Sequence, residues 1–233
     1  MLISSYFFKL LIKESKFEPI QSITMEHSSL IQLLKTRLPN WSTNDEIRQK
    51  MAPFDLGSRM EEARKTSDYR LGGVLILLFE KNGEPHLALI QRPEYDGVHS
   101  GQIAFPGGKM EDGDNDLEYT ALRETWEEIG TFPELTTIIG KLSDVFIPPS
   151  RFMVSPFVGF YSGEPTFIKD DFEVEKVLEM PISLLLDDQI VQRGKVKVGV
   201  ENYTLVVPFF DVFGHKVWGA TAIMLSELKA IIQ

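Results

Sequence analysis

The sequence predicts an α/β protein in which helices cover both faces of a mixed β-sheet, a three-layer α/β/α arrangement. The first observation is the apolar run at residues 71–80, which is typical of a strand buried on both faces. The second is the pair Asn82-Gly83, a strong hairpin signal ahead of another apolar segment at residues 86–91. The third is Leu117–Ile129, an amphipathic segment that stops before a glycine and predicts a helix beside the sheet.

The rest of the chain mixes short strands with a few helices. Further strands are predicted at residues 103–105, 138–140, 152–161, 195–200 and 203–210. Helices are predicted at residues 27–38, 182–187 and 221–232, with a helical turn at residues 60–65. Two of the helices are expected to flank the sheet.

Composition points to a single domain. The chain has 233 residues, 43% of them hydrophobic, which is enough for one substantial core. We expect the domain at residues 26–233, with its own N-terminal helix, and an extension outside it at residues 1–25. The net charge of −10 excludes the basic surface that a nucleic-acid backbone requires. No run reaches the ~20 apolar residues of a membrane span.

The chain contains no cysteine, which excludes disulfides, zinc–thiolate sites and thiol catalysis. This composition agrees with a reducing compartment, so we expect a cytoplasmic protein. The expected partner is a small molecule, and the sequence leaves the oligomeric state open, a homodimer included.

Three carboxylates, Glu124, Glu127 and Glu128, fall within one arc of the predicted helix. Glu124 and Glu128, at i and i+4, would repel each other by ~0.2–0.5 kcal/mol on an exposed face. A divalent cation would offset this repulsion, and hard oxygen ligands suit Mg²⁺ or Mn²⁺. The alternative interpretation is the solvated face of a charged helix. The opposite, buried side is expected to carry Leu122, Thr125, Trp126 and Ile129.

Several residues ahead of this helix are candidates for contacts with a substrate. Gly107 and Gly108 suit a backbone that turns sharply and approaches a ligand closely. Lys109 would touch a phosphate or only solvent. Arg92, at the end of a predicted strand, is interpreted as an anchor for a phosphate or as part of a structural ion pair. His99 is interpreted as a hydrogen-bonded loop histidine in preference to a general base.

From Gly108 to Ile129 the sequence resembles the Nudix box, the loop–helix motif of hydrolases that cleave nucleoside diphosphates linked to another group. The spacer ahead of the helical part of the motif is longer than in the general box. Asn115 takes the place of the acidic residue usual in this spacer, and Asp114 lies beside it. The matching residues are Arg123, Glu124, Glu127, Glu128 and Gly130.

The longer spacer is similar to that of one branch of the family, the coenzyme A pyrophosphatase-like branch. Other similar segments are residues 89–92, 99–108, 154–158, 173–174 and 218–222. The branch carries a Leu-Arg pair where this chain has Asp96 and Gly97, so a cation that would contact a substrate phosphate is missing here.

The resemblance implies a pyrophosphatase that uses Mg²⁺ or Mn²⁺ bound by Glu124 and Glu128, with Glu127 assisting. Arg123 would hold a neighbouring carboxylate in position. Glu127 is the favoured general base, and Glu173 is the alternative. The implied substrate is coenzyme A or an acyl-CoA, split into adenosine 3′,5′-bisphosphate and the phosphopantetheine part. Two alternatives stay open: hydrolysis of ADP-ribose or a dinucleotide, and a Nudix-fold module that binds a nucleotide without chemistry.

Overall fold

The computed structural model describes residues 26–233 except residues 67, 98 and 199–202. The predicted extension at residues 1–25 therefore lies outside the described residues, as does the end of the strand predicted at 195–200. The described helices are α1 (His27–Arg37), α2 (Asp45–Met51), α3 (Leu56–Thr66), α4 (Leu117–Ile129), α5 (Ile182–Leu186) and α6 (Gly219–Ile232). Short 3-10 helices are η1 (Leu38–Asn40), η2 (Pro133–Leu135), η3 (Pro148–Ser150) and η4 (Asp188–Ile190).

The strands form two sheets. The first eight are β1 (Arg70–Lys81), β2 (Glu84–Gln91), β3 (Ile103–Ala104), β4 (Gly107–Lys109), β5 (Thr136–Lys141), β6 (Val145–Ile147), β7 (Phe152–Tyr161) and β8 (Lys176–Pro181). They make the central sheet, in the order β3-β2-β1-β7-β5, with β4 paired to β1, β6 to β7 and β8 to β2. A second sheet contains β9 (Val191–Val198), β10 (Tyr203–Val212) and β11 (His215–Val217).

The central sheet is mixed, as predicted. Strand β1 runs parallel to β7 and antiparallel to β2 and β4. The turn between β1 and β2 places Asn82 and Gly83 at φ 53° and 79°, the left-handed values that a two-residue hairpin of this type requires. Because β1 lies inside the sheet, residues 75–79 are buried on both faces, which explains their continuous apolar run.

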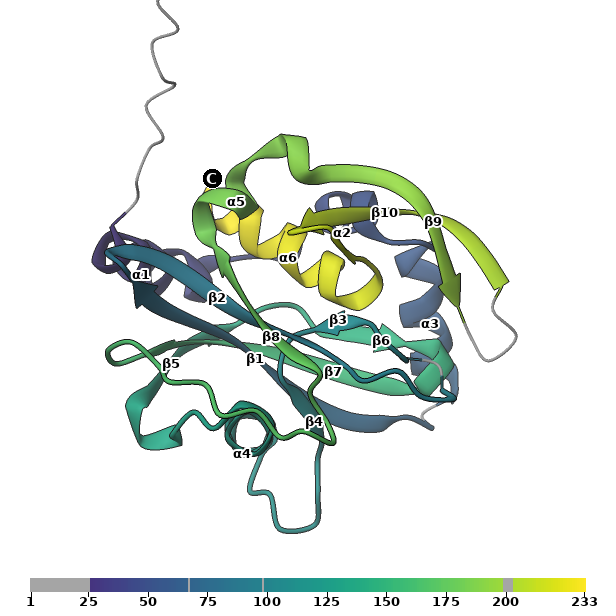
Figure 1. The fold of residues 1–233 in the computed structure, drawn as a ribbon. Helices are drawn as coiled ribbons and strands as arrows, with labels where there is room; N and C mark the ends of the chain where they lie inside the picture. Colours follow the sequence, from purple (N-terminus) through teal and green to yellow (C-terminus); the bar gives the residue numbers. More distant parts are fainter. Residues whose placement is uncertain (1–25, 67, 98, 199–202) are drawn as a thin grey trace, which may run out of the picture.

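Helices cover both faces of this sheet (Figure 1). On one face α4 packs against β1, β4 and β7. On the other face, α1 and α6 bury their apolar sides, and the second sheet contacts α6 through β10. Side chains of β1 alternate between the two cores, as the two-residue period of a strand requires: Leu75 and Leu77 on the α4 side, Ile76 and Leu78 on the α6 side. The predicted α/β/α layering is confirmed.

Several elements differ from the sequence-based prediction. The helical turn predicted at residues 60–65 is part of the longer helix α3. Helix α2 and the strands β6, β8 and β11 were not predicted. These segments are too short to show a clear hydrophobic period, and pairing defines the strands: β6 with the adjacent β7, β11 with the adjacent β10, and β8 with the distant β2. No described helix has both the length and the hydropathy to cross a membrane.

A buried charge pair links α6 to the N-terminal helices. Glu227 of α6 is almost fully buried, and its Oε2 lies 3.4 Å from Nε of the equally buried Arg48 in α2. Its Oε1 accepts hydrogen bonds from Trp41 Nε1 at 3.1 Å and Ser143 Oγ at 2.6 Å. Because an isolated buried charge is costly, these partners fix α2 against α6.

Replacing Arg48 by methionine is expected to lower the free energy of unfolding by about 3–5 kcal/mol, because Glu227 would be left buried without its cation. The matched control is Lys65→Met, which removes an exposed pair with Glu61 and is expected to change stability by less than about 0.5 kcal/mol. Urea unfolding at pH 7 measures both. Equal effects of the two substitutions would contradict this account of α2.

Candidate active site

Strand β4 determines where the candidate site lies, because it holds Gly107 and Gly108 between β1 and α4. Gly107 has φ 140°, and a Cβ there would overlap the backbone of Gly73. A Cβ on Gly108 would overlap the carboxylate of Glu124. The sequence predicted a loop here, but the two glycines pair with β1 as a short strand. Only glycine permits this approach of strand, sheet and helix.

Glu128 is a buried carboxylate, with 2% of its surface exposed. Its Oε2 accepts a hydrogen bond of 2.8 Å from the backbone N–H of Gly107. Burial raises the pKa of Glu128 to about 8, although the Gly107 amide and the nearby Arg92 guanidinium act in the opposite direction. This carboxylate therefore sits where negative charge is costly without a further cation.

Glu124 lies one turn earlier on α4, and its side chain, 15% exposed, packs against the same glycine strand. Burial raises the pKa of its carboxyl, while Arg123 acts against that rise through a contact of 3.0 Å between Nη2 and Oε1. The negative charge of Glu173 raises the pKa of both Glu124 and Glu128, so three carboxyl groups share one electrostatic environment.

The predicted orientation of α4 was partly wrong. Thr125 and Ile129 are buried as predicted, but Trp126 is 48% exposed and Glu128 is buried in its place. The reason is the position of β1 and β4, which contact the helix at Ala121, Glu124 and Glu128. The three glutamates therefore do not share one exposed face.

Arg123 is held by a carboxylate in the long spacer. Its Nε lies 2.8 Å from Oδ1 of Asp114 and its Nη2 lies 2.9 Å from Oδ2, a two-point contact. Asp114 also accepts hydrogen bonds from the Glu111 amide and the Thr120 hydroxyl. The Arg123 guanidinium holds the pKa of Asp114 well below its ordinary value. Sequence comparison placed Asn115 at the acidic position of the motif, but Asp114 supplies this carboxylate.

Glu127 lies apart from the other two glutamates. It is 47% exposed on its side chain and accepts a hydrogen bond of 2.9 Å from Nη1 of Arg123. It does not line the cavity that Glu124 and Glu128 border. The structure therefore brings Arg123, Glu124 and Glu127 into one ion-pair network and directs Glu128 to the cavity from the same helix.

Glu173 reaches the cavity from a different part of the chain. It belongs to the connection between β7 and β8, which passes the end of α4 (Figure 1). Two backbone hydrogen bonds fix this connection to the helix: Ile168 N to Ile129 O at 3.0 Å, and Asp170 N to Glu128 O at 2.9 Å. The Asp170 side chain then accepts a hydrogen bond from the Glu173 amide at 3.1 Å. The backbone at Glu173 is therefore positioned relative to Glu128.

The predicted cationic and histidine residues also border this cavity. Arg92 has a buried Nε that makes no hydrogen bond to any described residue. His99 Nδ1 lies 3.1 Å from Oε1 of Gln102, and burial lowers the pKa of this imidazole, with Arg92 acting in the same direction. Lys109 is exposed, and its carbonyl accepts a hydrogen bond from Arg123.

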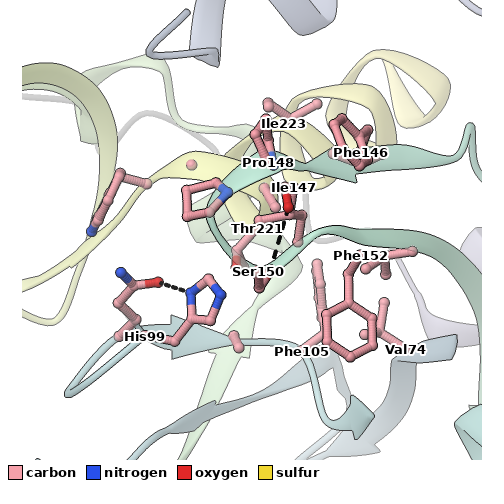
Figure 2. A pocket seen from close by; sticks show the side chains of 18 of the residues that line it. Val74, His99, Phe105, Phe146, Ile147, Pro148, Ser150, Phe152, Thr221 and Ile223 are labelled. Atoms are coloured by element: carbon pink, nitrogen blue, oxygen red, sulfur yellow. Dashed lines mark hydrogen bonds between the residues drawn. The ribbon is translucent and has the colours of Figure 1, made fainter. Parts of the chain in front are cut away.

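The cavity has a volume of about 630 Å³ and two chemically different ends. One end carries the charged residues just described. The other end is apolar; Figure 2 shows His99 on one side of the pocket and the rings of Phe105, Phe146 and Phe152 on the other. Sequence reasoning did not predict the apolar end, because its walls come from segments far apart in the chain.

A divalent cation fits the donor set of this site. No three acidic or histidine side chains within the described ranges converge closely enough to form a complete set of protein ligands. Mg²⁺, however, is usually bound by one or two carboxylates, with water and substrate phosphates completing its shell. Glu124 and Glu128 supply two such carboxylates beside the cavity, and burial makes their charge costly without a cation.

Comparison with known proteins assigns the chain to a family. A model of the NUDIX domain matches residues 70–195, which is more than half of the chain. The chain therefore belongs to the Nudix family, and it is a Nudix hydrolase of nucleoside diphosphate derivatives. The match begins at β1 and ends in β9, so α1 to α3 and the segment from β10 to α6 lie outside it.

Three relatives illustrate the similarity. Nudix hydrolase 3 of Caenorhabditis elegans is 32% identical over 177 residues, 68% of this chain and 72% of the relative. The uncharacterized Nudix hydrolase NudL of Escherichia coli is 31% identical over 171 residues, 71% and 84% of the two chains. The mitochondrial coenzyme A diphosphatase NUDT8 of Homo sapiens is 34% identical over 156 residues, 65% and 64% of the two chains. The similarity to the coenzyme A branch is thus confirmed.

Replacing Asp114 by asparagine is expected to lower the free energy of unfolding by about 1.5–3 kcal/mol at pH 7, because charged hydrogen bonds to Arg123 are lost. The pKa of Asp114 is lower in the folded protein, so its contribution is present above the ordinary value of 3.8 and is lost as the pH falls below it. The difference between wild type and Asp114→Asn should therefore shrink below about pH 4. Urea unfolding at several pH values measures this difference in the free energy of unfolding, with Asp112→Asn, a substitution of an exposed residue, as the control. A difference that grows at low pH would contradict the proposed ion pair between Asp114 and Arg123.

Proposed function

We propose that this protein hydrolyses the diphosphate bond of coenzyme A or an acyl-CoA, releasing adenosine 3′,5′-bisphosphate and the phosphopantetheine part. The observation that carries the proposal is one cavity bordered by Glu124, Glu128 and Glu173 together with Arg92. The similarity to a relative named as a coenzyme A diphosphatase supports the choice of substrate. Nudix hydrolases in general use divalent metal ions, and Mg²⁺ or Mn²⁺ is the proposed cofactor.

Glu124 and Glu128 would hold the cation, and Arg123 would keep Glu124 in position. When bound, the cation supplies positive charge that neutralises the diphosphate and favours deprotonation of the attacking water. Asp114 in turn fixes the Arg123 guanidinium in the orientation that this contact needs. Glu127 would assist through its hydrogen bond to Arg123.

The diphosphate would be bound by groups at the charged end of the cavity. The unpaired Nε of Arg92 offers a buried donor to a phosphate oxygen, and Lys109 offers a second, exposed cation. Gly107 and Gly108 border the same cavity, and their lack of side chains lets Glu124 and Glu128 lie against β4 at the place where the diphosphate would bind. His99 is held by Gln102 and contributes a polar wall to the cavity.

Hydrolysis requires a base for the attacking water. The water oxygen forms a bond to one phosphorus, the bond from that phosphorus to the bridging oxygen breaks, and the departing phosphate keeps the electron pair. Glu173 is the better placed acceptor for the water proton, because it borders the cavity while Glu127 is paired with Arg123. This choice reverses the preference that the sequence suggested.

A second candidate substrate class is ADP-ribose or a dinucleotide. The observation in its favour is Asp96-Gly97, where the coenzyme A branch carries a cation. A nucleotide-binding module without activity is the remaining alternative. The cytoplasmic location stays a prediction, because relatives include proteins named as mitochondrial and chloroplastic. The homodimer also stays a prediction.

Purified protein with Mn²⁺ is expected to cleave coenzyme A faster than ADP-ribose or a dinucleotide, with adenosine 3′,5′-bisphosphate as one product. Glu128→Gln is expected to reduce turnover by at least roughly a hundredfold while the protein stays folded, because one of the two cation ligands is lost. Chromatography of the products and circular dichroism measure these effects. Faster cleavage of ADP-ribose than of coenzyme A would contradict the proposal that coenzyme A is the substrate. Tight binding of a nucleotide without any cleavage would favour the nucleotide-binding module.

The choice of base is tested by comparing Glu173→Gln with Glu127→Gln. General-base catalysis is worth roughly 10²–10⁴-fold, so Glu173→Gln should lower kcat by that factor with little change in KM. Glu127→Gln should have a smaller effect, because it removes only an exposed partner of Arg123. Steady-state kinetics on coenzyme A separates them, and a larger loss in Glu127→Gln would restore Glu127 as the base.

A further inference from the structure

Glu173 lies in a turn of residues 170–173, the Glu173 turn, within the connection that passes the C-terminal end of α4 (Figure 1). The approach of the two segments is close. Gly130 ends α4 with φ 74°, and a Cβ on this residue would lie 2.9 Å from the carbonyl oxygen of Ile168. Glycine at this position therefore allows the connection to run directly against the helix that carries the proposed cation ligands.

The chain is anchored after the Glu173 turn, but the turn itself extends into solvent. Val174 is fully buried in the core on the α4 side, and its carbonyl accepts a hydrogen bond of 3.0 Å from Lys169 Nζ. The Glu175 amide donates to the Gln91 carbonyl of β2 at 2.9 Å. Within the turn, by contrast, Phe172 is 92% exposed. Hydrogen bonds, and not apolar packing, therefore determine the backbone conformation of the turn.

Asp170 makes these hydrogen bonds with both its side chain and its backbone. Its Oδ1 accepts from the Phe172 amide at 2.7 Å and from the Glu173 amide at 3.1 Å. Its own amide donates to the Glu128 carbonyl at 2.9 Å, and its carbonyl accepts from the Val174 amide at 2.9 Å. An aspartate that accepts from amides two and three residues later closes a turn, and the carbonyl oxygen of an asparagine can do the same. One side chain thus fixes the backbone that leads into Glu173.

The position of Glu173 requires such a constraint because of the charges around it. Glu173 borders the cavity, and its charge raises the pKa of Glu124 and Glu128. Repulsion between these like charges favours conformations that turn Glu173 away to solvent. Asp170 does not border the cavity, so it acts on the site only through the residues that it holds.

We propose that Asp170 is a positioning residue, which holds the Glu173 turn so that the Glu173 carboxylate faces the cavity and can accept the proton of the attacking water. The inference rests on the proposed function, in which Glu173 is the base, and it adds the residue on which that role depends. Because the Asp170 amide bonds to Glu128, the same residue also fixes the base relative to a proposed cation ligand. A misplacement of about 1 Å in such a constellation can cost roughly a hundredfold in rate.

The first test compares two substitutions of Asp170 by steady-state kinetics with coenzyme A and Mn²⁺. Asp170→Ala removes the acceptor and is expected to lower kcat by roughly ten- to a hundredfold. KM should change little, because Arg92 and the proposed cation ligands are intact. Asp170→Asn keeps an acceptor for the two amides and should restore most of the wild-type kcat. An equal loss in both variants would overturn the inference, because the charge of Asp170 and not its hydrogen bonds would then matter.

The matched control is Asp187→Ala. Asp187 Oδ1 accepts a hydrogen bond of 2.8 Å from the Gln189 amide at the start of η4, and neither residue borders the cavity. This substitution therefore removes a similar side-chain contact to the backbone elsewhere in the fold, and it should leave kcat and KM at their wild-type values. Thermal unfolding shows that each variant is folded.

A double-mutant cycle distinguishes positioning from a general loss of structure. If Asp170 acts through Glu173, Asp170→Ala should cause little further loss of kcat in a protein that already carries Glu173→Gln. If the two substitutions reduce kcat independently, so that their fold-losses multiply, the inference is overturned.

Amide hydrogen exchange tests the turn without any substrate, which separates this inference from the proposed function. Asp170→Ala should accelerate exchange of the Phe172 and Glu173 amides, whereas Asp170→Asn should not. Unchanged exchange in Asp170→Ala would overturn the inference, even if the wild-type protein cleaves coenzyme A. Faster exchange in a protein that cleaves neither coenzyme A nor ADP-ribose would support the role of Asp170 in the turn and refute the proposed hydrolysis.

Discussion

The structure depends on one constraint, the burial of the Glu128 carboxylate against the Gly107 amide. This contact joins α4 to β4, and β4 lies there only because Gly107 and Gly108 have no side chains. Glu124 lies against the same strand one turn away. Two acidic groups are thereby held at low exposure beside a cavity, where their charge is costly. This unfavourable burial of charge occurs at the place where the proposed cation and diphosphate would bind.

The surrounding charges explain how the helix tolerates this arrangement. Asp114 orients Arg123, and Arg123 contacts both Glu124 and Glu127, so these four side chains form one ion-pair network beside α4. Glu128 lies outside this network and relies on a backbone amide and on the field of Arg92. Of the three glutamates of α4, Glu128 is the one without an ion pair to Arg123, which separates its proposed role from that of Glu127.

Local sequence patterns predicted the elements whose side chains repeat at a clear period. The buried strand β1, its hairpin and the limits of α4 follow from apolar runs, Asn82-Gly83 and the glycine after Ile129. The predicted orientation of α4 was partly wrong. The orientation depends on where β1 and β4 contact the helix, and the spacing of apolar residues along the helix does not show this. Glu173 could be assigned a place beside Glu128 only from backbone hydrogen bonds between distant segments. The apolar end of the cavity escaped prediction for the same reason.

The central claim is that Glu124 and Glu128 bind a divalent cation, and the most direct measurement is the melting temperature as a function of Mn²⁺ concentration. A ligand that binds only the folded state raises Tm progressively with its concentration. The account predicts such a rise for the wild-type protein and none for the double variant Glu124→Gln/Glu128→Gln, with no substrate present. The same rise in both proteins, or no rise in the wild type, would contradict the claim.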